Sequence, residues 1–263
     1  MPKQAAPPTR AGHAFPITTG PGVFRSLKTS ESVARDIVDS IVATGLGEGD
    51  VLPSEAKMVE EYGVSRESLR EGLRLLEAQG LISIRRGPGG GPVVGTVDPA
   101  NVGRMSTLFY HLVGATYREL VDAWGVAEGY LAERAARNTD RALVRATLEP
   151  FLADRDDDSI SVEGFVDHHV HFHALLGTLA GNRVMQLSLM AIGQIVTHHV
   201  VFTFDPRHVG ELIHDDHRDI AEAVIAGRPI KARDLMREHV EKIAATYEES
   251  AGRSVLDQLI EWR

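Results

Sequence analysis

The 263-residue chain contains no cysteine, which excludes disulfide bonds and thiolate metal ligands. Any metal ion must therefore be held by histidine, aspartate or glutamate. The chain also lacks the roughly 18 consecutive apolar residues that a membrane-spanning helix needs. Residues 1–27 have no apolar block of the kind a signal peptide carries; they are rich in proline, glycine, alanine and threonine. This composition predicts a disordered N-terminal arm on a cytoplasmic protein with no membrane partner.

Acidic residues outnumber basic ones, and the excess is confined to one part of the chain. The formal net charge is −9. Residues 1–97 carry 11 basic and 11 acidic side chains, whereas the remaining residues carry 17 and 26. A neutral first part and an acidic second part indicate two functional halves.

The pattern over residues 28–97 predicts three helices followed by a β-hairpin. Ser30, Ser54 and Ser65 each precede a segment with helical apolar spacing and are suitable helix caps. After the third helix, residues 81–86 and 93–97 are expected to form strands joined by the turn GPGGGP. This order is typical of a winged helix-turn-helix, whose third helix enters the major groove of DNA.

Three arginines, Arg66, Arg70 and Arg74, are spaced by four residues along one side of the expected third helix. Arginine makes bidentate contacts with guanine and with phosphate, so this side can face DNA. The alternative is a solvated face on which the arginines pair with neighbouring glutamates, namely Glu67, Glu71 and Glu77.

The segment GDVLPSEAKMVEEYGVSRESLREGLRLLEAQGLISIRRGPGG resembles the DNA-binding domain of GntR-type bacterial regulators. That family has the pattern PG-x-x-LPSE, then GVSR-x-x-x-REAL-x-x-LE-x-x-GL, then a basic wing with glycine. The resemblance implies a double-stranded DNA operator as partner. It places DNA contacts on residues of the third helix and the wing: Ser65, Arg66, Ser68, Arg70, Arg86 and Gly87. One departure is Ala56, where the family has an arginine that contacts phosphate or base.

From residue 98 onward, long amphipathic patterns predict an all-helical bundle. Helices are expected over residues 98–113, 117–137, 139–154, 161–180, 183–203, 208–226, 229–250 and 254–262. The expected fold class is therefore mainly α. A winged helix-turn-helix over residues 28–97 precedes a helical domain over residues 98–263.

Four of the twelve histidines are predicted to face inward. At about 100° per residue, His169 and His173 fall in the apolar sector of one helix, one turn apart, whereas His171 falls on the opposite side. His217 and His239 lie in the apolar stripes of two later helices. A lone inward histidine is commonly a hydrogen-bonded core residue, whereas four on three helices can also hold Zn, Ni, Cu or Fe.

The segment FHALLGTLAGN, residues 172–182, and the span from His217 to His239 resemble the FCD ligand-binding domain of FadR-like GntR regulators. In metal-binding FCD domains an aspartate and three histidines hold a divalent ion. The matching positions here are His169, His173, His217 and His239, and His169 stands where the family has aspartate. The resemblance implies a divalent metal ion, with zinc the first choice and nickel or another transition metal as alternatives, beside a small-molecule effector.

A second departure concerns the effector. The family commonly has an arginine at the position of Trp124, four residues before Glu128, and that arginine often meets an acidic effector. With Trp124 there, the effector can be a small organic acid or a more neutral or aromatic metabolite.

The resulting interpretation is a ligand-responsive transcription regulator, a repressor as is commoner in the family, and not an enzyme. It is expected to bind a palindromic operator as a homodimer and to be cytoplasmic and nucleoid-associated. Two alternatives stay open. The histidines could serve a metal-dependent enzyme, or they could line the polar pocket of a metal-free regulator.

Overall fold

The computed structural model of the chain describes residues 15–17, 27–87, 90–153, 161–199, 210–252 and 254–262. The chain divides into two compact units: one formed by residues 18–101, the other by residues 1–17 together with residues 102–263. Most of the arm predicted over residues 1–27 lies outside the described residues.

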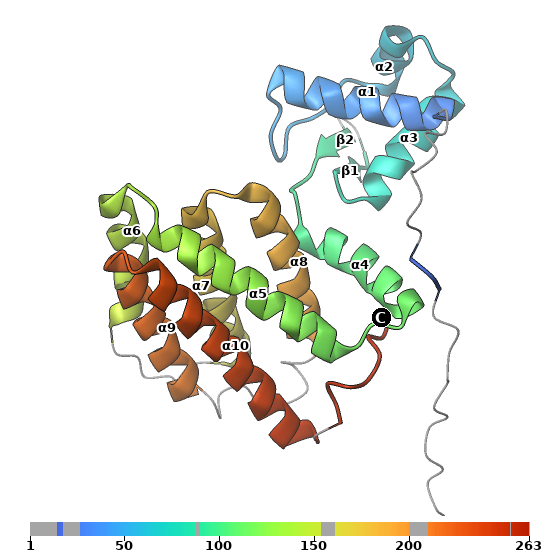
Figure 1. Cartoon of the computed structure of the whole chain (residues 1–263). Helices are drawn as coiled ribbons and strands as arrows, with labels where there is room; N and C mark the ends of the chain where they lie inside the picture. Colours follow the sequence, from blue (N-terminus) through green and yellow to red (C-terminus); the bar gives the residue numbers. More distant parts are fainter. Residues whose placement is uncertain are drawn as a thin grey trace, which may run out of the picture. The chain divides into compact units, whose positions relative to one another are not determined.

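The described part of residues 18–101 folds as three helices and a hairpin (Figure 1). Its elements are α1 (Thr29–Thr44), α2 (Glu55–Tyr62), α3 (Arg66–Ala78), β1 (Ile82–Arg85) and β2 (Gly91–Val94). The strands pair antiparallel, with Ile82 opposite Val94. Their order confirms the winged helix-turn-helix, in which α2 and α3 form the helix-turn-helix pair. The apolar faces of the helices meet the hairpin in one core, which includes Ile37, Leu52, Met58, Leu69, Leu73, Leu76 and Ile82.

Serine caps begin two of these helices, as predicted. Ser54 Oγ accepts a hydrogen bond from the Lys57 N–H, and Ser65 Oγ accepts one from the Ser68 N–H. The prediction of a Ser30 cap was wrong, because α1 starts earlier and Lys28 is its cap residue. The Lys28 N–H donates to the Glu31 side chain at 2.9 Å, so an acidic side chain satisfies the first backbone donor.

The second strand was predicted over residues 93–97 but spans Gly91–Val94. The register explains the difference. Val94 pairs with Ile82, the first residue of β1, so residues 95–97 would need partners at the end of α3. There Gly80 has a left-handed conformation with φ of 72°, which ends the helix and is no part of a strand.

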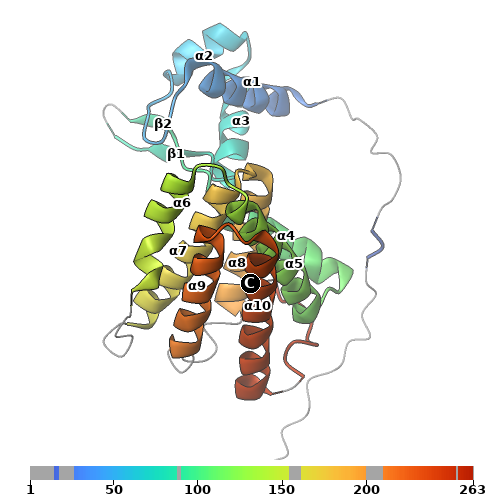
Figure 2. The same cartoon turned by 60° about the vertical axis from the view of Figure 1, so that its left-hand side comes forward.

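The other unit is helical in its described part. Its elements are α4 (Pro99–Val113, which begins three residues before the unit does), α5 (Tyr117–Ala136), α6 (Arg141–Leu148), the 3₁₀ turn η1 (Glu149–Leu152), α7 (Val162–Ala180), α8 (Arg183–His199), α9 (Gly210–Ile225) and α10 (Pro229–Ala251). Helix α5 is the centre of the packing, since it contacts α7, α8, α9 and α10. Figure 1 shows α5 beside α10, and Figure 2 shows α7, α9 and α10 side by side.

Two of the predicted helices need correction. The helix expected over residues 139–154 is α6 followed by a 3₁₀ turn, because Pro150 has no N–H to continue the α-helical bonding. The helix expected over residues 254–262 does not form. These residues make turns and an isolated bridge between Leu259 and Thr116.

The C-terminal segment instead satisfies the start of α5. The N–H groups of Tyr117 and Arg118, which have no acceptor within the helix, donate to the carbonyls of Gln258 and Leu256 at 3.1 and 2.8 Å. Leu256 and Ile260 are each 1% exposed. Their spacing of four residues resembles a helical pattern, although both side chains are buried from an irregular segment.

In the ranges that the structure describes, every helix is too short or too polar to cross a membrane.

Candidate metal centre

Four buried histidines from three helices converge inside the helical unit. His169 and His173 come from α7, His217 from α9 and His239 from α10. Each is at most 9% exposed. One ring nitrogen from each histidine lies within 4.8 Å of a ring nitrogen of every other, which makes this a group that can hold a metal ion. The structure thus brings together all four histidines named from the sequence.

Helical geometry and aromatic packing set the positions of these rings. His169 and His173 are four residues apart, so they lie on one face of α7, and their ring centroids are 4.5 Å apart. Phe172 is fully buried and stacks on His217 with ring centroids 4.0 Å apart. The apolar packing of α7 therefore holds the α9 histidine against the α7 pair. His169 Nδ1 and His217 Nε2 lie 3.2 Å apart.

Burial keeps these imidazoles neutral. Desolvation lowers the pKa of His169 and of His217 well below the ordinary value, and the neighbouring histidines lower both further. Burial also lowers the pKa of His239, although the hydrogen bond with Asp216 acts in the other direction. A neutral imidazole has the lone pair that metal ligation requires.

Asp216 and Lys242 support His239 from behind. His239 Nδ1 lies 3.1 Å from Asp216 Oδ2, and Lys242 Nζ donates to Asp216 Oδ1 at 2.7 Å. Burial alone would raise the pKa of Asp216, but the hydrogen bonds from His239 and Lys242 outweigh it and lower that pKa. A carboxylate that accepts the Nδ1–H leaves the lone pair on Nε2, which is the arrangement typical of metal-binding histidines.

Unsatisfied nitrogens show that the residues fit a metal ion. The Nε2 atoms of His173 and His239 are fully buried and have no hydrogen-bond partner. Buried polar atoms are rarely left unpaired, and an ion is one explanation for such atoms. Four imidazole nitrogens suit Zn or another transition metal and would complete the tetrahedron of a structural zinc site.

The other histidines of the region lie outside this group. His171 is exposed, as predicted, and so is Asp167. His168 is half-buried and stacks against Phe151 at a centroid distance of 4.9 Å. His214 Nε2 is buried without a partner, but His214 is not among the four converging residues.

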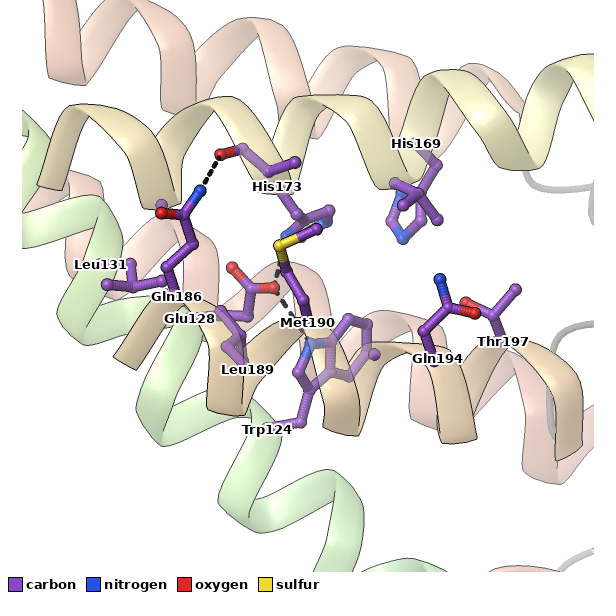
Figure 3. A pocket seen from close by; sticks show the side chains of 14 residues that line it. Trp124, Glu128, Leu131, His169, His173, Gln186, Leu189, Met190, Gln194 and Thr197 are labelled. Carbon is purple, nitrogen blue, oxygen red and sulfur yellow. Dashed lines mark hydrogen bonds and ion pairs between the residues drawn. The ribbon is translucent and has the colours of Figure 1, made fainter. Parts of the chain in front are cut away.

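A cavity of about 490 Å³, its open mouth included, adjoins the histidines. Figure 3 shows that α7 contributes His169 and His173, that α8 contributes Gln194 among others, and that α5 contributes Trp124 and Glu128. The volume lies within the range of small-molecule sites. The histidines that could hold an ion therefore also form part of the wall of a cavity.

The DNA-binding residues proposed from the sequence lie at the surface of the other unit. Ser65, Arg66 and Arg70 are exposed on α3, Ser68 is half-buried, and Arg86 and Gly87 are exposed at the end of β1. Gly87 has φ of 101°, a conformation that favours glycine. Ala56, the departure from the family pattern, is exposed on α2.

The arginines of α3 have some of the acidic neighbours that the alternative requires. Arg74 lies 3.8 Å from Glu71, whereas Arg70 donates to Glu55 of α2 at 3.0 Å. Both pairs are exposed, and exposed ion pairs contribute only about 0–1 kcal/mol. Exchanging Glu55 for a phosphate or a base would therefore cost little.

Sequence reasoning missed the carboxylates around the histidines. Asp216 precedes His217 in the chain but supports His239 on another helix. Glu128 was noted only for its distance from Trp124, yet its Oε1 lies 2.8 Å from His173 Nδ1. No periodic pattern marks such contacts, because they join different helices.

A DNA-reading head followed by a helical domain with a buried polar pocket defines a ligand-responsive transcription regulator. Residues 29–90 match the family described as bacterial regulatory proteins, gntR family, and residues 119–242 match the FCD domain. The chain belongs to the GntR family of bacterial regulators and carries a C-terminal FCD domain. Its relatives are regulators and not enzymes, so the metalloenzyme alternative is wrong.

Curated relatives are similar over most of their length. The chain is 28% identical over 236 residues to the HTH-type transcriptional repressor NanR of Salmonella schwarzengrund, which covers 84% of each protein. It is 27% identical over 252 residues to the NanR repressor of Salmonella arizonae, covering 88% of this chain and 90% of that one. Among solved structures, Streptococcus agalactiae GntR is similar with a TM-score of 0.59 at 22% identity, over 82% of this chain and 99% of that chain. This last likeness shows a shared fold.

Proposed function

We propose that this regulator is a repressor that binds a palindromic operator as a homodimer and releases it when an effector enters the FCD cavity. Residues 28–97 would read DNA, residues 98–263 would bind effector and form the dimer, and residues 1–27 would be an arm. Its place would be the cytoplasm, at the nucleoid. The repressor names of the NanR relatives support the sign of regulation.

The proposed operator contacts are Ser65, Arg66, Ser68 and Arg70 on α3, and Arg86 and Gly87 on the wing. Their exposure on a helix-turn-helix and its hairpin supports this assignment. Arginine side chains on such a helix can contact both guanine and phosphate.

The proposed metal site uses His169, His173, His217 and His239, and the observation that carries it is their convergence within 4.8 Å. We infer one divalent ion, zinc in the first place. When bound, the ion would join α7, α9 and α10 and supply a Lewis acid at the cavity wall. Zinc is commonly closed by four ligands, whereas nickel and other six-coordinate ions would leave positions for an effector atom.

Elemental analysis of the purified full-length protein tests the metal site. We expect about one divalent ion per chain in the wild type, and a large loss of metal in His173→Ala and in His217→Ala. His171→Ala is the matched control, because His171 is exposed on the same helix and should leave metal content unchanged.

Equal metal content in every variant, or none in any, would support the metal-free regulator instead. The 3.2 Å contact between His169 and His217 favours that second candidate, since the two rings can share a proton. The histidines would then be a polar lining of the effector cavity.

A further inference from the structure

Glu128 is the acidic residue in the wall of the cavity, and one of its two oxygens is unused. The side chain is 1% exposed. Trp124 Nε1 donates to Oε1 at 3.0 Å, and His173 Nδ1 lies 2.8 Å from the same oxygen. Oε2 is fully buried and has no hydrogen-bond partner. A buried carboxylate oxygen without a partner is unfavourable, so a donor that reaches it gains binding free energy.

The cavity offers no positive side chain to a negatively charged ligand. Among the residues that the structure places in its wall there is no lysine or arginine. The wall is otherwise built from apolar side chains, such as Leu131 and Leu189, and from uncharged polar ones, such as Gln194 and Thr197 (Figure 3). A simple carboxylic acid would therefore meet a buried carboxylate without an opposing cation, which is costly.

Trp124 adds a flat aromatic surface to the same wall. It is 4% exposed, and its only N–H is taken by Glu128, so it can offer the cavity nothing but its ring. Aromatic rings bind other rings and also cations through their faces. A ring and a hydrogen-bond donor are thus favoured at neighbouring points of one cavity.

We propose that Glu128 Oε2 recognises the effector, and that the cavity takes a ligand with an amine or another N–H donor attached to an aromatic or similar planar ring. This inference rests on the proposed function, because it names the class of effector for the same cavity. Glu128 acts through both oxygens: Oε1 holds Trp124 and His173 in place, and Oε2 binds the ligand.

Benzylamine and benzoate are suitable probes, since they have one ring and differ in the charged group. The chain has two tryptophans, and Trp262 is exposed at 61%. In full-length protein carrying Trp262→Phe, the fluorescence of Trp124 therefore reports on the cavity alone. We expect benzylamine to change this fluorescence with a dissociation constant roughly tenfold or more below that of benzoate.

Glu128→Gln tests the role of the carboxylate, because the amide places an N–H where the carboxylate has an acceptor. This variant should lose or reverse the preference for benzylamine. Glu133→Gln is the matched control, as Glu133 lies on the same helix and pairs with Arg137 instead of lining the cavity. It should keep the preference of the wild type.

Three results would overturn the inference: benzoate binding as tightly as benzylamine, an unchanged preference in Glu128→Gln, or no response of Trp124 to either probe. Operator binding is measured on the same preparations. Operator binding without the probe preference refutes this inference alone, whereas absence of operator binding refutes the proposed function.

Discussion

At the scale of single residues, the support of the histidines by carboxylates decides how well they can hold an ion. Asp216 joins His239 on one side and Lys242 on the other. The three groups come from two helices, and Asp216 faces away from the cavity residues. Its effect on an ion would therefore pass through the orientation and tautomer of His239.

We expect Asp216→Asn to weaken zinc binding by about 10- to 100-fold, the usual effect of losing such a partner. Zinc affinity is measured by competition with a chelating dye. Asp219→Asn is the control, because Asp219 is exposed on the same helix. Equal zinc affinities of Asp216→Asn and the wild type would show that His239 needs no support from Asp216.

The lowered pKa values also predict how stability depends on pH in metal-free protein. Below the ordinary histidine pKa of 6.5, the unfolded chain protonates His169, His217 and His239, whereas the folded chain keeps them neutral. The unfolded state then binds more protons, so the free energy of unfolding falls as pH decreases below 6.5 and is retained above it. Each histidine contributes at most about 1.4 kcal/mol per pH unit.

Urea denaturation in the presence of a chelator, between about pH 5 and 8, measures this dependence. His217→Gln should reduce the slope below the ordinary pKa, and His171→Gln should leave it unchanged. If His217→Gln has the wild-type slope, His217 is not held neutral by the fold.

At the scale of elements, the C-terminal segment is a structural part of α5. It supplies acceptors to the first N–H groups of that helix and buries Leu256 and Ile260. Helix α5 in turn carries Trp124 and Glu128. The segment therefore stabilises the helix that forms one wall of the cavity.

We expect Leu256→Ala to lower the free energy of unfolding by about 2–5 kcal/mol, as for other fully buried leucines. Leu259→Ala should change it by less than about 0.5 kcal/mol, because Leu259 is 44% exposed. Urea denaturation of both variants makes the comparison. Similar losses in the two would mean that burial at position 256 contributes little.

The elements show where sequence patterns are informative. Caps and apolar spacing gave α2, α3, α5 and α7 to within a residue or two, because these signals lie within the helix itself. The segment 254–262 was predicted wrongly. Its two buried residues have helical spacing, but its hydrogen bonds go to α5, which a local pattern cannot reveal.

At the scale of the whole molecule, function requires the DNA-reading unit and the helical unit in one chain. The neutral first part and the acidic second part of the sequence correspond to these two roles. An operator read by a two-fold dimer contains two related half-sites.

We expect a footprint with two such half-sites, and a loss of about 1–3 kcal/mol of specific binding free energy for each of Arg66→Ala and Arg70→Ala. Arg35→Ala removes the same charge from the exposed surface of α1 and should affect binding much less. A wild-type footprint from the Arg66→Ala, Arg70→Ala double variant would show that α3 does not read the operator through these arginines.

The sequence by itself determined the family, the winged helix-turn-helix and the four inward histidines. Family motifs are local, and a helix places residues four apart on one face whatever surrounds it. Only the tertiary structure decided that α7, α9 and α10 bring these histidines within 4.8 Å, that Asp216 supports His239 across two helices, and that Glu128 keeps a buried oxygen beside them. Such contacts join residues far apart in the chain, and they depend on how the helices pack.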